Sequence, residues 1–516
     1  MAVRVAVAAP NAMAARAGLQ VAEAGGRAVD AAVAASLVTM VTEPGIVSLA
    51  GGAFVTVWPH GAPEAVTVDG HVNMPGRDRP DGPVSVQEVR TGYGGGVTMT
   101  VGPGTTAVPG ALAALDLAQA RFGALPWAEV VAPAAEVART GFPLGSASGY
   151  YLPYVRDSTF GWDPETARAL RRPDGGWVET GDPMVIDGLA ATLSLIAEQG
   201  ARTLYDGELA RLLAADMAAR GGLVTAADLA AYRPLVRTAL GVRAGAWDLR
   251  TNPPPSLGGP VLAAMLTLLG DRPAGAWTEA DVAHLVAVQR RVLDARHDRL
   301  DVADDRTAAA LDLLREVGWT AAGSPSTAHV SVVDSTGSAC AITSSYGYGS
   351  GATLPGTGLW LNNCLGEHEL YRGTPPAPGE RLPSNMAPTV GRRDDGAVLA
   401  IGSPGADRIT TAMLQALASF AHGGASLQGA IDRPRLHVNH LDGDDALAAG
   451  TSVRVEAEED LPLPEVDLPV RRHHPQSMYF GGVGAALRFP DGDVEAAADP
   501  RRAGAALTSP TLLDRR

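Results

Sequence analysis

The stretch Ser324-Pro-Ser-Thr-Ala-His-Val-Ser-Val-Val-Asp334 decides the fold of this chain. Thr327 follows a Gly/Pro/Ser-rich loop and opens a run with the composition of a β-strand. Threonine is common at strand starts, so this stretch alone predicts only a strand. The other interpretation makes Thr327 a new N-terminus, whose freed α-amine would act as the base for its own hydroxyl and would need no His or Lys partner.

The segments around this stretch predict helices layered on antiparallel sheets. Asp334 to Gly337 forms a turn and 338–344 returns as a strand, while 54–58 and 64–69 alternate as a hairpin. Further strands are expected at 358–361 and 398–401, and the second is followed by a loop and a helix over 408–421. Two other segments are expected to be loops, a buried one over 43–52 and a Pro-rich one over 375–383. Helical spacing covers 12–24, 28–42, 110–140 and 186–232, whereas 163–176 is polar and turn-rich.

Composition excludes several classes of function. The 516 residues exceed one ordinary core, and only 5% are aromatic, so the core must be built from Ala, Val and Leu. The net charge is −15, and every basic residue is Arg. An acidic chain is a poor binder of nucleic acid, and a chain without Lys supports neither Schiff-base chemistry nor a polybasic membrane anchor.

No metal or cofactor motif is convincing. Cys340 and Cys364 are the only cysteines and are expected to be buried free thiols. The histidines 437, 440, 473 and 474 lack the spacing of a metal site, Gly145 to Gly149 is no nucleophile elbow, and Gly92 to Gly96 is expected to be a flexible turn. Pro10 interrupts the apolar N-terminus and no long apolar run follows, so we expect a soluble cytoplasmic protein with no membrane partner.

Nine segments recur together and in order, and with them the chain resembles the gamma-glutamyltransferase (gamma-glutamyltranspeptidase) family of N-terminal-nucleophile hydrolases. They cover nearly the whole chain and are residues 25–33, 51–54, 108–110, 252–259, 326–334, 358–363, 384–389, 402–405 and 499–501.

The resemblance implies an α+β fold, a four-layer αββα sandwich. It also implies autocatalytic cleavage of the Ser326–Thr327 bond, giving a large subunit (1–326) and a small subunit (327–516) that begins with the nucleophile Thr327. Ser345 would steady that nucleophile. The amides of Gly405 and Ala406 would form the oxyanion hole, provided that φ of Ala406 stays negative, with the helix from Arg408 aimed at the same point. No cofactor is implied.

The departures from the family converge on the substrate pocket. A family Arg that binds the glutamate α-carboxylate falls on His71, which cannot make that bidentate pair. The family Asn near the α-amine falls on Gly347, and Glu367 replaces an Asp that binds the substrate amine. Cys364 and the pair Ser384-Asn385 also differ from the pattern. We therefore predict a changed substrate, with His71 and Glu367 in one pocket.

Three functions remain open. The first is hydrolysis or acyl transfer on a small amide or gamma-glutamyl-like substrate derived from an amino acid. The second is a homologue recruited to specialised, antibiotic-type metabolism, which opens another amide or a C–C bond next to a ketone. The third is a binding scaffold without catalysis. The sequence also leaves open whether the two subunits assemble into a larger homo-oligomer.

Overall fold

The computed structural model describes residues 3–93, 96–271, 275, 277–318, 328–367, 374–441, 446–447 and 449–509. Thr327 and the predicted cleavage bond Ser326–Thr327 lie outside the described residues. Strand β11 begins at the next residue, Ala328.

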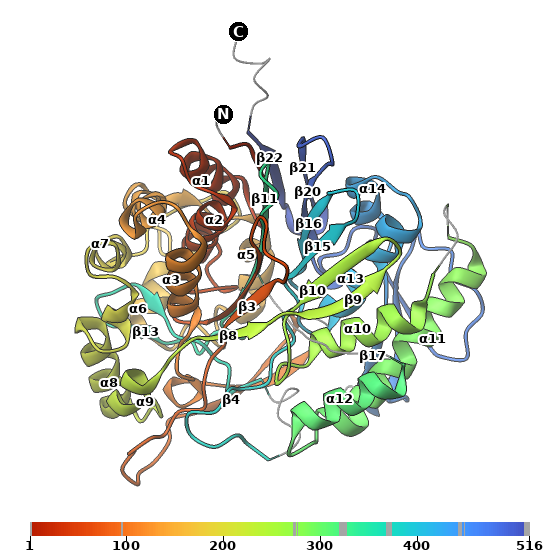
Figure 1. Cartoon of the computed structure of the whole chain (residues 1–516). Coiled ribbons are helices and arrows are strands. Elements are labelled where there is room, and N and C mark those ends of the chain that lie inside the picture. The colour runs from red at the N-terminus through yellow and green to blue at the C-terminus, as the bar shows by residue number, and fades with distance from the viewer. Residues whose placement is uncertain are drawn as a thin grey trace.

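The first of two large sheets has seven antiparallel strands, with β11 in its interior between β1 and β12 (Figure 1). Local hairpins account for only part of it, because the first and last strands of the chain pair with each other and β1 pairs with β11. In spatial order the strands are β22 (Ala505–Thr508), β1 (Val5–Ala9), β11 (Ala328–Asp334), β12 (Ala339–Ser345), β2 (Gly52–Trp58), β3 (Val66–Gly70) and β8 (Leu235–Thr238).

The second large sheet has six antiparallel strands and packs on the first through β16 and β20, which contact β11. Its order is β21 (Val494–Ala498), β20 (Gly484–Arg488), β16 (Val398–Gly402), β15 (Thr389–Arg393), β10 (Trp247–Thr251) and β9 (Leu240–Ala244). Four smaller sheets surround the sandwich: β4 (Gln87–Thr91) with β5 (Val97–Val101), β6 (Phe142–Pro143) with β7 (Pro183–Met184), β13 (Thr353–Leu354) with β14 (Leu359–Trp360), and β17 (Leu436–His440) with β18 (Val453–Glu458) and β19 (Val470–His473).

Helices cover the outer face of each sheet, so the αββα sandwich expected from the sequence is confirmed (Figure 1). On the first sheet lie α1 (Ala12–Glu23), α2 (Ala28–Thr42) and α3 (Ala111–Phe122), with α4 (Trp127–Thr140) and α7 (Leu189–Gln199) outside them. The second sheet is covered by α10 (Gly258–Leu269), α11 (Glu279–Ala295), α12 (Arg306–Glu316), α13 (Ile409–Leu417) and α14 (Leu427–Asp432). The remaining helices are α5 (Ser146–Val155), α6 (Pro164–Ala169), α8 (Glu208–Arg220) and α9 (Ala226–Ala231).

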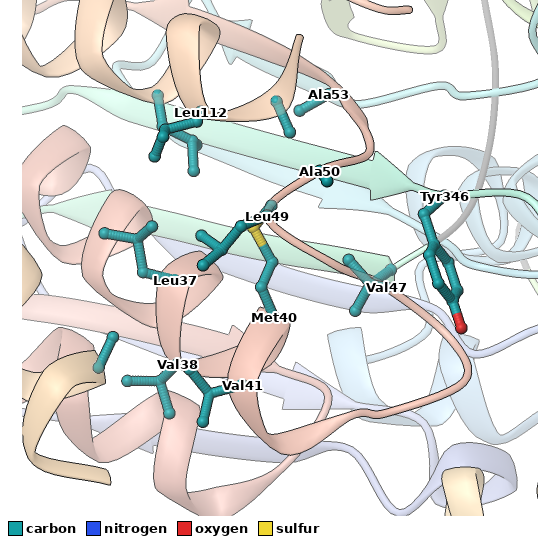
Figure 2. Packing of buried hydrophobic residues seen from close by; sticks show 14 of the residues in the cluster. Leu37, Val38, Met40, Val41, Val47, Leu49, Ala50, Ala53, Leu112 and Tyr346 are labelled. Atoms are coloured by element: carbon teal, nitrogen blue, oxygen red, sulfur yellow. The ribbon is translucent and has the colours of Figure 1, made fainter. Parts of the chain in front are cut away.

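Small side chains build the core, as the composition predicts. Helix α2 is buried along its whole length between the sheet and its neighbours, and a Cβ added to Gly18 of α1 would lie only 3.0 Å from the Ala31 carbonyl oxygen. Figure 2 shows part of this core, where α2 and the loop after it, with Val47 and Leu49, lie over the strands. The two sheets meet through another buried cluster rich in alanine, with Ala341 and Ala400 among its members.

The structure differs from the sequence-based expectations in several places. The N-terminal apolar run is the buried strand β1, and 163–176 contains the short helix α6. The Gly-rich segment 92–96 lies between the paired strands β4 and β5. Among the described residues, no helix is long and apolar enough to cross a membrane.

Candidate active site

The pairing around β11 sets the frame of the site. Ala328, the first described residue of the small-subunit segment, pairs with Ser344, and Ser345 then pairs with Gly52 of β2. Ser345 is therefore the next residue along β12, at the end of the sheet from which the chain enters β11. It lies two residues after Thr343 and so on the same face, which is turned toward the second sheet.

Ser345 and Glu367 lie on either side of Gly347. The Gly347 N–H donates to Ser345 Oγ over 3.1 Å, and Gly347 has a φ of +70°. A Cβ at Gly347 would lie 3.2 Å from Glu367 Oε2, so the absence of a side chain lets the carboxylate approach the backbone. The lack of a side chain at Gly347 therefore leaves room for Glu367 beside Ser345.

His71 lies on the other side of Ser345, against Gly52. A Cβ at Gly52 would lie 2.7 Å from His71 Nδ1, and the imidazole stacks on Phe54 with 5.6 Å between ring centroids. His71 Nε2 lies 3.3 Å from the Pro383 carbonyl oxygen, which can only accept, so this nitrogen carries the proton. Burial lowers the pKa of His71 to about 4, and the imidazole is neutral near pH 7. His71 therefore supplies no positive charge to this pocket near pH 7.

A buried ion-pair network lies beside His71 and engages Arg381. Asp69 pairs with Arg381 at 2.9 Å and with Arg237 at 2.8 Å. Arg381 also donates to Asn73 Oδ1 and to the carbonyl oxygens of Asp69 and Arg233. Its guanidinium is thus engaged on every side by protein groups, and it holds β3 to the 374–383 loop instead of facing a ligand.

The other predicted pocket residues lie on the same side as His71. Cys364 packs in a buried cluster with Val72, Ala107 and Leu382, and burial raises the pKa of its thiol well above the usual range. Ser384 and Asn385 follow the Pro383 carbonyl that His71 contacts, and the Ser384 carbonyl accepts from the Leu257 N–H over 3.1 Å. Asn385 Oδ1 is buried without a hydrogen-bond partner in the described part of the chain.

The loop Ser403–Ala406 leaves β16 beside the start of β11, because Gly402 lies directly on the His329 ring. The N–H groups of Gly405 and Ala406 donate to no acceptor among the described residues, as an oxyanion hole requires. Ala406 has a φ of +53°, so the condition of negative φ that was attached to the expected oxyanion hole is not met. The left-handed conformation turns the backbone here and strains a residue that has a Cβ.

Sequence reasoning gave no role to His329, which links the two sheets at this end. Its Nε2 lies 2.6 Å from Ser331 Oγ, and Ser331 donates to the Gly484 carbonyl oxygen over 3.1 Å. Nε2 therefore donates to Ser331, and Nδ1 accepts from Thr343 Oγ1 over 2.9 Å. Burial lowers the pKa of His329 to about 3, so the network is neutral. The sequence did contain a signal for this network, because His329 and Ser331 are two residues apart on one strand and therefore share a face.

Sequence reasoning also missed a cationic and aromatic wall next to the Ser403–Ala406 loop. Arg408 lies 4.6 Å above the Tyr479 ring, and Asp407 beside it holds the pKa of the guanidinium above its usual range although burial lowers it. Tyr151 donates to the Tyr348 carbonyl oxygen over 3.0 Å and packs edge-on against Tyr93 at 5.0 Å. These residues come from segments far apart in sequence, so spacing alone cannot reveal them.

Neither cysteine forms a disulfide, and both are buried, as predicted. Among the described residues, no cluster of three His, Cys, Asp or Glu side chains could hold a metal ion. The histidines weighed as metal ligands have protein partners instead: His440 contacts Asp294 at 2.9 Å and His473 contacts Glu456 at 2.7 Å.

Comparison with known proteins agrees with this arrangement. The profile of the gamma-glutamyltranspeptidase family matches residues 14–318 and 301–509. The chain is 31% identical to the acylase ACY 1 proenzyme of Pseudomonas sp. (strain V22), over 94% of this chain and 90% of that one. It is 28% identical to the glutathione hydrolase proenzyme of Escherichia coli (strain K12), over 96% and 90% of the two chains. The crystal structure of cephalosporin acylase from Bacillus halodurans superposes with a TM-score of 0.78, at 23% identity and over 98% and 96% of the two chains. The chain belongs to the gamma-glutamyltranspeptidase family, whose members are enzymes that hydrolyse or transfer amide bonds.

Proposed function

We propose that this chain is a proenzyme that cleaves its own Ser326–Thr327 bond and then uses Thr327 as an N-terminal nucleophile on a small amide. The observation that carries the proposal is the position of β11, which begins at Ala328, one residue after Thr327, beside the end of β12 and the loop that follows Gly402. In that loop the N–H groups of Gly405 and Ala406 have no acceptor within the described part of the chain. Relatives named as proenzymes support the processing step.

In this mechanism the Thr327 hydroxyl attacks the substrate carbonyl and its own α-amine takes the proton. The amides of Gly405 and Ala406 stabilise the oxyanion, and Ser345 orients the nucleophile. The amine of the substrate leaves with the proton, and an acyl ester on Thr327 Oγ remains. Water or another amine then attacks this ester and restores the hydroxyl.

We further propose that the acyl group carries an amine but no free α-carboxylate. His71 is neutral and its only N–H is engaged, and Arg381 is consumed by Asp69, so neither binds a carboxylate. Glu367 places a carboxyl group beside Ser345, which repels an anion and favours an amine. A pocket that departs in this way from the glutamyl pattern suits a family member recruited to specialised metabolism.

Three p-nitroanilides that differ only in the substituents of the acyl chain test this proposal. The γ-glutamyl compound has both an amine and a carboxylate, the 4-aminobutanoyl compound has only the amine, and the glutaryl compound has only the carboxylate. We expect kcat/KM to be at least tenfold higher for 4-aminobutanoyl than for γ-glutamyl, and lowest for glutaryl. Equal or better turnover of the γ-glutamyl compound would contradict the assignment of the pocket.

A further inference from the structure

Four tyrosines form a cluster between α5 and the end of β4. Tyr150, Tyr151 and Tyr154 lie on α5, and Tyr93 follows β4. The ring of Tyr93 meets all three, with 5.0 Å between its centroid and that of Tyr151, 6.0 Å to Tyr154 and 6.5 Å to Tyr150. Tyr150 and Tyr154 also contact each other, with 5.6 Å between centroids. The chain contains only ten tyrosines, so four in one place call for an explanation.

The tyrosine cluster is fixed to the loop that follows Ser345. The Tyr151 hydroxyl donates to the Tyr348 carbonyl oxygen over 3.0 Å, and Tyr348 is only three residues after Ser345. Burial raises the pKa of Tyr151 well above its usual range, and the charge of Glu367 adds to the rise. The buried side of the cluster therefore lies near the proposed substrate pocket.

Two further observations place the cluster at the end of the sandwich where β11 begins. Ala147, one turn before the first tyrosine of α5, lines the same pocket as Ala328, the first residue of β11. Burial lowers the pKa of the Arg408 guanidinium, whereas Asp407 and, more weakly, Tyr93 raise it. Tyr93 is therefore close enough to Arg408, just after the 403–406 loop, to interact with its charge.

Two rings of the cluster are open to solvent. Tyr150 is 45% and Tyr154 is 40% exposed, whereas Tyr151 is buried. Among the described residues, the next most exposed aromatic residue is Phe489, at 36%. A chain with few aromatic residues gains most by burying them, because each ring removes a large apolar area from water. Two exposed rings side by side near the proposed site therefore indicate a ligand-binding surface.

The charges around the cluster decide which ligand suits it. A tyrosine ring face binds either a second aromatic ring or a cation. Burial and a hydrogen bond with Tyr154 raise the pKa of Tyr150 to about 12, although Arg502 lowers it, so Tyr150 is uncharged near pH 7. Arg502 near Tyr150 and Arg408 near Tyr93 would both repel a cation. A neutral aromatic ring is therefore the better ligand.

We infer that the exposed faces of Tyr150 and Tyr154 bind an aromatic ring of the amide substrate. The inference rests on the proposed function. The planes of Tyr93 and Tyr150 meet at 72° and those of Tyr150 and Tyr154 at 57°, so the cluster presents ring faces and ring edges together. An added ring can stack on one tyrosine and meet the edge of the next, and each such contact raises affinity by about two- to tenfold.

Two pairs of amides, alike except that cyclohexyl replaces phenyl, test the inference and show which half of the substrate carries the ring. In the first pair, 4-aminobutanoic acid is joined to 2-phenylethylamine or to 2-cyclohexylethylamine, so the ring is in the amine half. In the second pair, 4-amino-5-phenylpentanoic acid or its cyclohexyl analogue is joined to ethylamine, so the ring is in the acyl half.

Each amide competes with a 4-aminobutanoyl or γ-glutamyl p-nitroanilide for the processed enzyme, and nitroaniline release is the signal. A slowly cleaved amide then still reports its affinity. We expect the inhibition constant to be at least fivefold lower for the phenyl member of one pair, and that pair identifies the half that carries the ring. Equal constants within both pairs would overturn the inference, whereas no nitroaniline release from either anilide would overturn the proposed function itself.

Variants locate the binding surface. The double variant Tyr150→Leu/Tyr154→Leu keeps apolar side chains but removes both rings, so the preference for phenyl should fall below twofold. Tyr150→Phe/Tyr154→Phe keeps the rings and should keep the preference. Phe489→Leu removes an exposed ring directly after β20 and should not change it. A processed Tyr150→Leu/Tyr154→Leu enzyme that keeps the full preference for phenyl would contradict the role of these tyrosines.

Discussion

At the scale of single residues, burial decides what each site group can do. His71, which the resemblance placed in the substrate pocket, is neutral, has its N–H on Pro383, and lies against Gly52. Its protonation state depends on Phe54, Asp69 and Arg381, which surround it only after folding. The sequence therefore allows His71 to be proposed as a site residue, but its charge could not be predicted from the sequence.

Substitution of His71 tests this reading of the pocket. His71→Arg should restore a cation for an α-carboxylate and raise kcat/KM for the γ-glutamyl anilide relative to the 4-aminobutanoyl anilide by about tenfold, since a charge-assisted hydrogen bond contributes about 1.5–3 kcal/mol. His71→Gln adds no charge and should leave the ratio near wild type. Steady-state kinetics on processed enzyme measures this ratio of kcat/KM values. The same ratio in His71→Arg and His71→Gln would contradict the prediction.

The neutral state of His71 also predicts a pH dependence of stability. Because its pKa is lowered from 6.5 to about 4 on folding, its contribution to stability is complete above pH 6.5 and is lost as pH falls toward 4. The loss for one such residue is on the order of 3 kcal/mol. In His71→Asn, the fall in the free energy of unfolding between pH 7 and 4 should be smaller than in wild type by roughly this amount. Urea unfolding at each pH gives these free energies. The same fall between pH 7 and 4 in both proteins would contradict the lowered pKa of His71.

At the scale of elements, local patterns predicted the hairpins and many helices, because alternation and helical spacing are properties of neighbouring residues. The pairing of β1 with β11 and β22 could not be predicted in this way, since it joins segments more than 300 residues apart. The helices α10–α12 were also missed, partly because Gly258-Gly259-Pro260 opens α10 and resembles a loop. The turn at Ala406 shows the same limit, because its φ depends on the approach of Gly481 to Gly405.

Ala406 gives a prediction at this scale. Its left-handed backbone costs an alanine about 1–2 kcal/mol that a glycine does not incur. Ala406→Gly should therefore raise the free energy of unfolding by up to about 1 kcal/mol, after the higher chain entropy of glycine is included, and should keep activity. Ala406→Val should destabilise the loop and reduce kcat. Thermal unfolding measures the stability of both variants, and anilide kinetics measures their activity. A lower stability of Ala406→Gly than of wild type would contradict the proposed strain at Ala406.

At the scale of the whole molecule, two sheets meet at the start of β11, and each contributes one part of the site. The first sheet carries Ser345 at the end of β12 and leads into His71 directly after β3, and the second leads into the loop with Gly405 and Ala406 after β16. A chain break before β11 would leave the small-subunit segment paired with two strands of the large-subunit segment, β11 with β1 and β12 with β2. Cleavage is thus compatible with an intact sandwich, and the two products should stay associated without a covalent link.

The mass of the purified protein under denaturing conditions tests the central claim, the N-terminal nucleophile, most directly. We predict two chains, residues 1–326 and 327–516, with Thr327 as the first residue of the smaller one, and a single inactive chain for Thr327→Ala. Thr336→Ala changes a threonine in the turn after β11 and should be processed as wild type. Wild-type protein that turns over an amide while it remains one uncleaved chain would contradict the account.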